Sequence, residues 1–158
     1  MLAPLALGIV LRDARDLDAS VKALYGTISG PAGQARDWNA FRNLFAKDAK
    51  LNVVAKGTKG SRLVALTPDD YVKNAGPYLE KNGFFESEIA RRTVRYGDMA
   101  SVWTTYESRM KRDDAKPFER GVNCVLYARL EGEWKIVNLT YTDETNAGPL
   151  PAEFLKGG

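Results

Sequence analysis

The sequence predicts an α+β domain whose helices pack on one face of an antiparallel sheet. Apolar residues recur at helical spacing in the first half of the chain, up to Asn82. Over residues 84–144, runs rich in β-branched and aromatic side chains alternate with turn signals, as strands joined in hairpins do. Helix runs that are segregated from strand runs along a chain are typical of α+β domains.

The length of 158 residues predicts one domain that buries about two-thirds of the surface of its unfolded chain. A hydrophobic content of 44% is ordinary for a globular domain. We place this domain at residues 17–146, after an N-terminal arm (1–16) and before a proline-containing tail (147–158).

Three helices are expected before the strands. They cover residues 17–30, residues from Asp37 to about Phe45, and residues 67–82, where Thr67 is placed to cap the helix and proline follows it. Between the second and third helices, residues 51–55 form a short extended run, and the polar residues 56–62 read as a loop.

The last hairpin, residues 121–144, is the strongest strand signal. Its first run has an unbroken apolar row that includes Cys124 and Leu126, and we expect this face to be concave. Strict alternation places Leu139 and Tyr141 on one face of the second run. The opposite, outer face then carries Val125, Tyr127, Trp134, Ile136 and Asn138.

Composition excludes several classes of site. The chain has no histidine, which removes His-based triads and the commonest zinc ligands, and we expect no metal and no cofactor. Its one cysteine cannot form an intrachain disulfide. The net charge of +3 is spread among carboxylates rather than clustered, so we expect no nucleic-acid partner.

The N-terminus carries an apolar run at residues 2–11 that Pro4 and Gly8 interrupt. The run is too short to span a bilayer. It resembles the apolar part of a secretory signal but lacks the positive segment before it. A truncated signal and a short ordered arm are both consistent with it, so cytoplasmic and exported locations stay open.

Three segments resemble the nuclear transport factor 2-like superfamily, which includes ketosteroid isomerases, scytalone dehydratases and SnoaL-like polyketide cyclases. They are residues 38–45 followed by Lys47-Asp48-Ala49, the strand at 101–107, and the ending at 132–137. The resemblance covers residues 17–144 and is greatest to an uncharacterised bacterial group of SnoaL-like proteins. It implies a cone in which three N-terminal helices pack on a curved mixed, mainly antiparallel sheet.

The resemblance also allows a test for isomerase chemistry. Ketosteroid isomerases use a general-base aspartate on the first strand and a protonated aspartate on the penultimate strand. These positions fall at about Val53 and Leu126, which are both apolar. The resemblance therefore implies that the isomerase acid/base pair is missing.

Our leading hypothesis is that a small apolar or aromatic molecule binds in the cone. An apolar pocket with one or two polar anchors suits such a ligand. The candidate binding residues are Tyr25, Trp38, Val53, Trp103, Cys124, Leu126, Leu139 and Tyr141.

The first alternative is a cofactor-independent isomerase, cyclase or dehydratase that uses Glu107 or Asp143 with Tyr141. Glu107 lies inside a strand, where a lone charge is costly unless it is paired. It either lines the mouth of the cavity or forms an ion pair with Arg109 or Arg120 on the outer face.

The second alternative is a dimerisation module without a ligand. Three helices cannot readily cover both faces of the sheet, and a large exposed apolar face usually marks an interface. We therefore expect a homodimer that forms through the outer sheet face.

Overall fold

The computed structural model describes residues 4–157, with side chains from Asp16 onward. The three N-terminal helices are α1 (Pro4–Ile28), α2 (Trp38–Asn43) and α3 (Pro68–Asn82). The strands are β1 (Phe45–Gly57), β2 (Gly60–Leu66), β3 (Phe85–Tyr96), β4 (Met99–Arg109), β5 (Glu119–Leu130) and β6 (Glu133–Asp143). A short helix α4 (Glu144–Ala147) and a 3-10 turn (Ala152–Phe154) follow. The predicted boundary at residue 16 falls inside α1.

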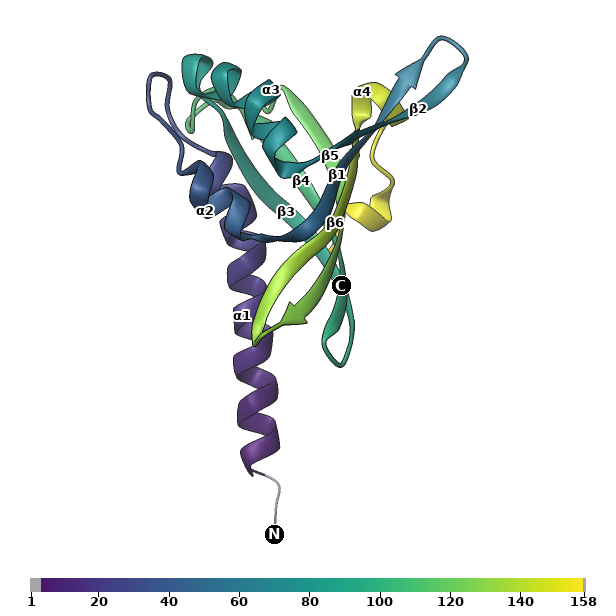
Figure 1. The fold of residues 1–158 in the computed structure, drawn as a ribbon. Helices are drawn as coiled ribbons and strands as arrows, with labels where there is room; N and C mark the ends of the chain where they lie inside the picture. The colour runs from purple at the N-terminus through teal and green to yellow at the C-terminus, as the bar shows by residue number, and fades with distance from the viewer. Residues whose placement is uncertain (1–3, 158) are drawn as a thin grey trace.

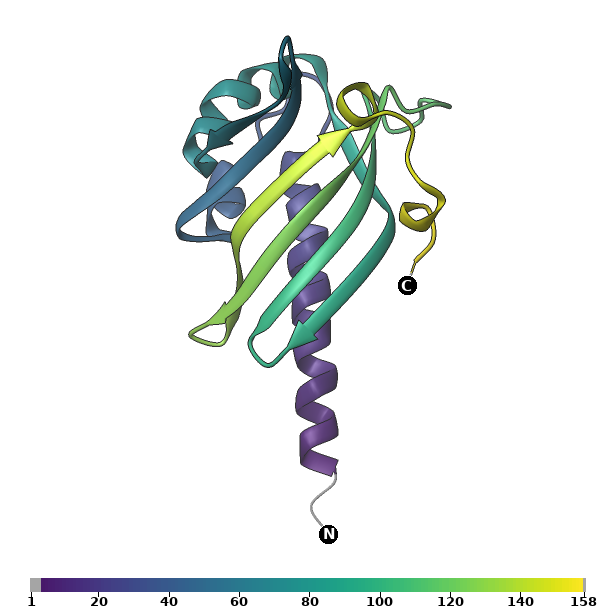
Figure 2. The same ribbon diagram turned by 90° about the vertical axis from the view of Figure 1, so that its right-hand side faces the viewer.

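The strands form one six-stranded sheet in the order β2-β1-β6-β5-β4-β3. Every neighbouring pair is antiparallel except β1 and β6, which are parallel. Figure 1 shows α1, α2 and α3 on one side of the curved sheet, with α4 and the C-terminal segment on the other. Figure 2 shows the strands from that second side, with α1 behind them. The predicted α+β class with a mixed, mainly antiparallel sheet is confirmed.

The segment expected to be a loop at residues 56–62 is instead part of a hairpin, so that prediction is wrong. β1 continues to Gly57, and β2 begins at Gly60, where the backbone φ is +114°. β2 lies at the edge of the sheet, and most of its residues are exposed. An exposed edge strand needs no buried row, so the apolar alternation that identifies other strands is weak here.

A β-bulge in β6 reverses the predicted faces. Leu126 pairs with Asn138 while Tyr127 pairs with Ile136, which leaves Val137 as an extra residue. One extra residue moves every later side chain to the other face. Ile136 therefore shares its face with Leu139, although strict alternation had separated them.

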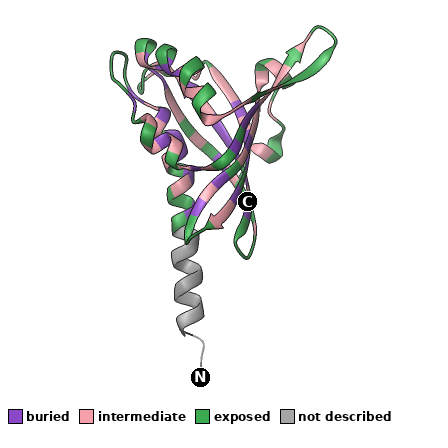
Figure 3. Ribbon diagram, in the orientation of Figure 1, coloured by how far each residue is buried: buried purple, intermediate pink, exposed green. Residues whose placement is uncertain are grey.

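The bulged hairpin buries the row that had been assigned to the outer face. Val125, Tyr127 and Ile136 are at most 1% exposed, and Trp134 is 5% exposed. They belong to one core cluster with the α1 residues Leu17, Val21, Leu24 and Ile28. In Figure 3 the buried positions gather where the helices meet the sheet. The expectation that the Leu126 face is concave is wrong, because alternation separates two faces but does not say which one the helices cover.

The loop between α1 and α2 is held by a buried arginine. Arg36 is 8% exposed, and its guanidinium donates hydrogen bonds to five backbone carbonyls. The carbonyls belong to Ile28, Gly30, Pro31, Gln34 and Leu79, at 2.5–3.3 Å. These contacts join the end of α1 to the end of α3, and so fix the rim of the cone.

The start of α3 follows the prediction. Thr67 caps it by accepting from the Asp70 backbone, while the Asp70 carboxylate accepts from the Thr67 backbone. No helix among the described residues is both long and apolar enough to cross a membrane.

Candidate functional site

A cavity of about 180 Å³ lies between the helices and the covered face of the sheet. Its apolar wall includes Leu24, Ile28, Leu79 and Phe84. This volume is comparable to the ~150 Å³ engineered cavity that accepts a benzene ring. Polar groups come almost entirely from the strands: Glu86, Tyr106, Glu119, Asn123 and Tyr141, with Tyr71 from α3.

Two carboxyl groups are brought together by the strand register. Glu86 on β3 lies opposite Ser108 on β4, and Ser108 lies opposite Glu119 on β5. Cross-strand partners share a face, so the three side chains form one row across the sheet. The Ser108 hydroxyl donates to Glu86 Oε2 at 3.0 Å.

The next row toward the centre of the sheet carries Tyr106 opposite Gly121. The Tyr106 hydroxyl donates a long hydrogen bond of 3.4 Å to Glu119 Oε1. A side chain at Gly121 would collide with that hydroxyl, so the glycine provides the space into which Tyr106 leans. The phenol is therefore held beside the carboxyl pair.

The surroundings favour the neutral form of these carboxyl groups. Burial, reinforced by the nearby charge of Glu119 and opposed by the Ser108 hydrogen bond, raises the pKa of Glu86 to about 8. Burial and the charge of Asp143 also raise the pKa of Glu119, against the effect of the Tyr106 hydrogen bond. A carboxyl group whose pKa lies near physiological pH can both give and take a proton there.

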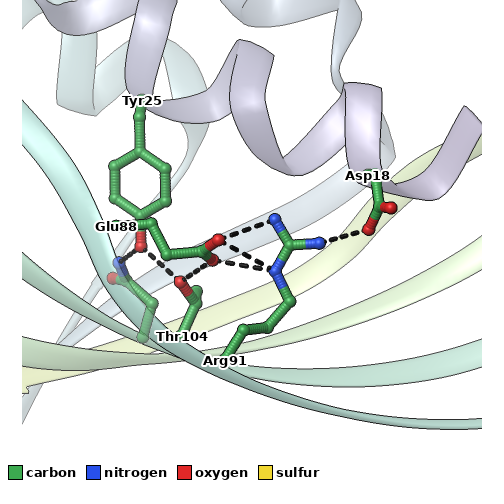
Figure 4. Close-up of polar contacts among 6 residues, drawn as sticks. Asp18, Tyr25, Glu88, Arg91 and Thr104 are labelled. Carbon is green, nitrogen blue, oxygen red and sulfur yellow. Dashed lines mark hydrogen bonds and ion pairs between the residues drawn. The ribbon is translucent and has the colours of Figure 1, made fainter. Parts of the chain in front are cut away.

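A second set of polar residues reaches from the exposed side chain of Asp18 to Asn123 in the cavity wall. Figure 4 shows the contacts among them. The set begins at Asp18 on α1, which pairs with Arg91, and Arg91 binds both oxygens of Glu88. Thr104 donates to Glu88 and is 2.8 Å from the Tyr25 hydroxyl. The Asn123 amide donates to the same hydroxyl at 3.2 Å. We call Asp18, Arg91, Glu88, Thr104, Tyr25 and Asn123 the polar chain.

A second β-bulge builds this polar chain. Glu88 pairs with Tyr106 and Ala90 with Thr105, so Ile89 is the extra residue in β3. The bulge puts Glu88 and Arg91 on the same face of the sheet, where strict alternation would have separated them.

Four of the predicted binding residues lie near this cavity. Leu139 and Tyr141 line it, and Tyr25 adjoins it through its bond to Asn123. Val53 pairs with Tyr141 across β1 and β6 but is not part of the cavity wall.

Trp38 does not line the cavity either. Its ring packs edge-on against Phe41 and touches Gly76, while its indole nitrogen donates to Glu80 at 2.8 Å. It serves to pack α2 against α3.

The other three predicted binding residues lie on the opposite face of the sheet. Trp103 and Cys124 border a separate hollow of about 380 Å³ beneath the C-terminal segment. Leu126 is 42% exposed on the same face. They miss the cavity because the face assignment was inverted.

Neither predicted catalytic carboxylate enters the cavity. Glu107 forms an ion pair with Arg109 at 2.5 Å and lies opposite Arg120 in the register, as the outer-face alternative had it. Asp143 caps α4 by accepting from the Asn146 backbone at 2.8 Å. Tyr141, their proposed partner, does line the cavity.

Sequence reasoning missed Glu86 and Glu119. A weak signal exists for Glu119, since the following residues of the same parity in β5 are largely buried. It is lost for Glu86, because most residues of its parity in β3 are exposed beyond the bulge at Ile89. A charge at the first inward position of a strand is expected at the mouth of a cavity or at a solvated rim. Sequence alone does not distinguish these two settings.

Solved structures with the same architecture exist at low sequence identity. A nuclear transport factor 2-like protein with a cystatin-like fold from Novosphingobium aromaticivorans is 16% identical, with a TM-score of 0.68 over 90% of each chain. A similar protein of unknown function from Silicibacter pomeroyi is 18% identical, with a TM-score of 0.62 over 85% of this chain and 98% of that one. A hexachlorocyclohexane dehydrochlorinase is 11% identical, with a TM-score of 0.59 over 84% of this chain and 86% of that one.

No family model and no curated protein matches the sequence. At identities this low, the structural likeness shows the fold alone. The protein has the nuclear transport factor 2-like fold, as the sequence resemblance predicted.

Proposed function

We propose that the protein binds a small, uncharged, largely apolar molecule in the cavity and moves a proton on it, with Glu86 as the general acid and base. The observation that supports this most directly is the position of Glu86. It lies in a row with Ser108 and Glu119, at a cavity whose wall is largely apolar. A carboxyl group with a perturbed pKa in a cleft is a candidate for acid/base catalysis.

The preference for an uncharged molecule follows from the charges in the wall. Two carboxyl groups line the cavity, and among the described residues no lysine or arginine does. An anionic ligand would be repelled by any ionised carboxylate and would have no cation to pair with. A neutral ring would displace little except water and contact the apolar wall.

The chemistry would be an isomerisation or an elimination without a cofactor. The Glu86 carboxylate would take a proton from carbon, and the electron pair left behind would form a double bond. In an isomerisation Glu86 would return the same proton to another atom. In an elimination the bond between the neighbouring carbon and the leaving group would break, the leaving group would depart with the electron pair of that bond, and Glu86 would lose its proton to solvent. The dehydrochlorinase among the structural neighbours is named for an elimination, which is consistent with this proposal.

Glu86 thus takes the role that sequence reasoning had offered to Glu107 or Asp143. The cavity argues against a ligand-free module, because a cone that served only for dimerisation would have no need of an open space lined by two carboxyl groups.

A generic proton-abstraction probe tests the proposal without knowledge of the natural substrate. 5-Nitrobenzisoxazole is an uncharged bicyclic molecule that opens to a coloured phenolate when a base removes the proton from the carbon beside its nitrogen. We expect catalysed ring opening whose rate rises with pH through about 8, the pKa of Glu86. Glu86→Gln should reduce the rate at least about a hundredfold, the usual contribution of a positioned base.

Glu107→Gln is the matched control, because it makes the same substitution on the outer face of the sheet. It should leave the rate unchanged. Equal rates for the Glu86→Gln and Glu107→Gln variants would reject Glu86 as the acid/base group.

We also propose that a second copy of the chain covers the outer sheet face. Trp103 (41% exposed), Leu126 (42%) and Val137 (36%) lie on neighbouring strands there. Apolar side chains grouped in this way usually mark an interface. Of the set named from the sequence, Val125, Tyr127, Trp134 and Ile136 instead lie in the core with α1. Asn138 pairs with Leu126 and stays on the outer face.

A further inference from the structure

We infer that Asn123 determines which ligands the cavity accepts, because the polar chain holds its amide so that the oxygen faces the ligand and accepts a hydrogen bond. The ligand would be an uncharged molecule with a hydroxyl or N–H donor on an apolar ring. This inference rests on the proposed binding site and adds to it the chemistry of the bound molecule.

Within the polar chain, Glu88 can only accept hydrogen bonds. Glu88 receives three contacts of 2.8–3.0 Å from Arg91, and Arg91 also pairs with Asp18. A carboxylate bound in this way by a guanidinium is ionised, and an ionised carboxylate has no proton to donate.

Each following hydroxyl then has one assigned role. Thr104 must donate its only proton to Glu88, so its oxygen accepts from the Tyr25 hydroxyl at 2.8 Å. Burial, followed by the charge of Glu86, raises the pKa of Tyr25 above its usual range, so the phenol keeps the proton that it donates.

With its proton committed to Thr104, the Tyr25 oxygen can only accept from Asn123. The group at 3.2 Å from it must therefore be the amide nitrogen of Asn123. This assignment follows from the donor and acceptor inventory along the polar chain, since an amide oxygen in that place would face another acceptor.

The amide oxygen of Asn123 is then available to accept a hydrogen bond from a ligand in the cavity. Asn123 is 6% exposed and forms part of the cavity wall. Within residues 16–157, no group donates a hydrogen bond to Asn123 Oδ1. A carbonyl oxygen without a donor in a largely apolar space favours a ligand that brings one.

The polar chain also explains why this orientation is stable. To turn the amide over, Tyr25 would have to donate to Asn123 and withdraw its proton from Thr104. Thr104 would then lose the hydrogen bond that it accepts, in a site where it is fully buried. Asn123 thus selects the ligand by accepting a hydrogen bond from it, while Thr104 and Tyr25 are positioning residues that hold the Asn123 amide in place.

The experiment compares phenol with toluene, two rings of nearly the same shape of which only phenol carries a donor. Isothermal titration calorimetry would give both dissociation constants and the ratio of phenol affinity to toluene affinity. We expect Asn123→Leu to lower this ratio about tenfold, the effect of one hydrogen bond to a buried acceptor. Thr104→Val should lower the ratio severalfold although Asn123 is intact, because the amide is then free to turn.

Thr105→Val is the matched control. Thr105 is the sequence neighbour of Thr104, is buried as deeply, and points to the other face, where it bonds to the Phe154 carbonyl at 2.6 Å. Its substitution should leave the ratio unchanged. Tyr25→Phe provides a second interruption of the polar chain if the Thr104 variant does not fold, and thermal unfolding of each variant establishes that it is native.

The outcomes separate this inference from the proposed function. If both probes bind and Asn123→Leu leaves the ratio within twofold, the role of Asn123 is rejected while the binding site stands. If Asn123→Leu lowers the ratio but neither Thr104→Val nor Tyr25→Phe does, the positioning role of the polar chain is rejected. If neither probe binds the unmodified protein, both the inference and the proposed site fail.

Discussion

A Cβ atom added to Gly121 would lie 2.5 Å from the hydroxyl oxygen of Tyr106. Gly121 lies within β5, where a glycine weakens a strand unless another group uses the space. Here that group is the phenol, which crosses β5 and reaches Glu119. The position of Tyr106 beside the carboxyl pair therefore depends on a missing side chain on the neighbouring strand.

Gly121→Ala should destabilise the protein by about 1–3 kcal/mol, the usual cost of an added methyl group in a packed site. The new carbon would also meet the backbone oxygen of Thr142, which cannot move aside as a side chain can. Urea denaturation measures the loss. As a control, Gly26→Ala places a methyl group in open space within α1 and should stabilise by about 0.5–1 kcal/mol. Equal stabilities for the two variants would contradict the role given to Gly121.

Arg36→Lys should lower the free energy of unfolding by about 2–4 kcal/mol, because an ammonium group cannot reach five carbonyls arranged around a planar guanidinium. The control is Arg42→Lys, in an exposed ion pair with Asp69, where the change should cost less than about 1 kcal/mol. Chemical denaturation of both variants gives the comparison. A loss for Arg36→Lys no larger than for Arg42→Lys would show that the carbonyl contacts contribute little.

Glu86 should make stability depend on pH in a defined window. Its pKa is about 8 in the folded protein against an ordinary value of 4.5, so between these values the folded state holds a proton that the unfolded state has lost. The contribution of Glu86 to the free energy of unfolding is therefore fully present below about pH 4.5 and decreases as the pH rises to about 8. The slope for one proton is at most about 1.4 kcal/mol per pH unit.

Glu86→Gln removes this dependence, so the variant should gain stability relative to the unmodified protein as the pH rises from 5 to 8. Unfolding free energies at several pH values test the difference, with Glu107→Gln as the reference for an outer-face carboxylate. A constant difference between Glu86→Gln and the unmodified protein over this window would mean that Glu86 titrates normally.

The outer sheet face should mediate self-association. Leu126→Lys places a charge among the exposed apolar side chains and should convert a dimer into a monomer in sedimentation velocity. Leu63→Lys makes the same change on β2, at the far edge of the sheet, where Leu63 is 62% exposed, and should leave the dimer intact. A monomeric unmodified protein would remove this prediction altogether.

Local patterns in the sequence determined the class of the fold and several element ends. The Thr67–Asp70 cap and the proline after Thr67 predicted where α3 begins, because capping acts between residues that are neighbours in the chain. The strand runs after Asn82 predicted an antiparallel sheet, because alternation and turn residues are also local. The outer-face ion pair of Glu107 was among the alternatives, since its two partners are two residues apart.

Tertiary structure decided which face of the sheet became the site. The bulges at Ile89 and Val137 reverse the alternation within β3 and β6, and neither has a local marker in the sequence. The row of Glu86, Ser108 and Glu119 exists only because three strands pair in one register. Register and helix packing depend on contacts between residues far apart in the chain. Periodicity could therefore separate the two faces of the sheet but could not say which one α1 would cover.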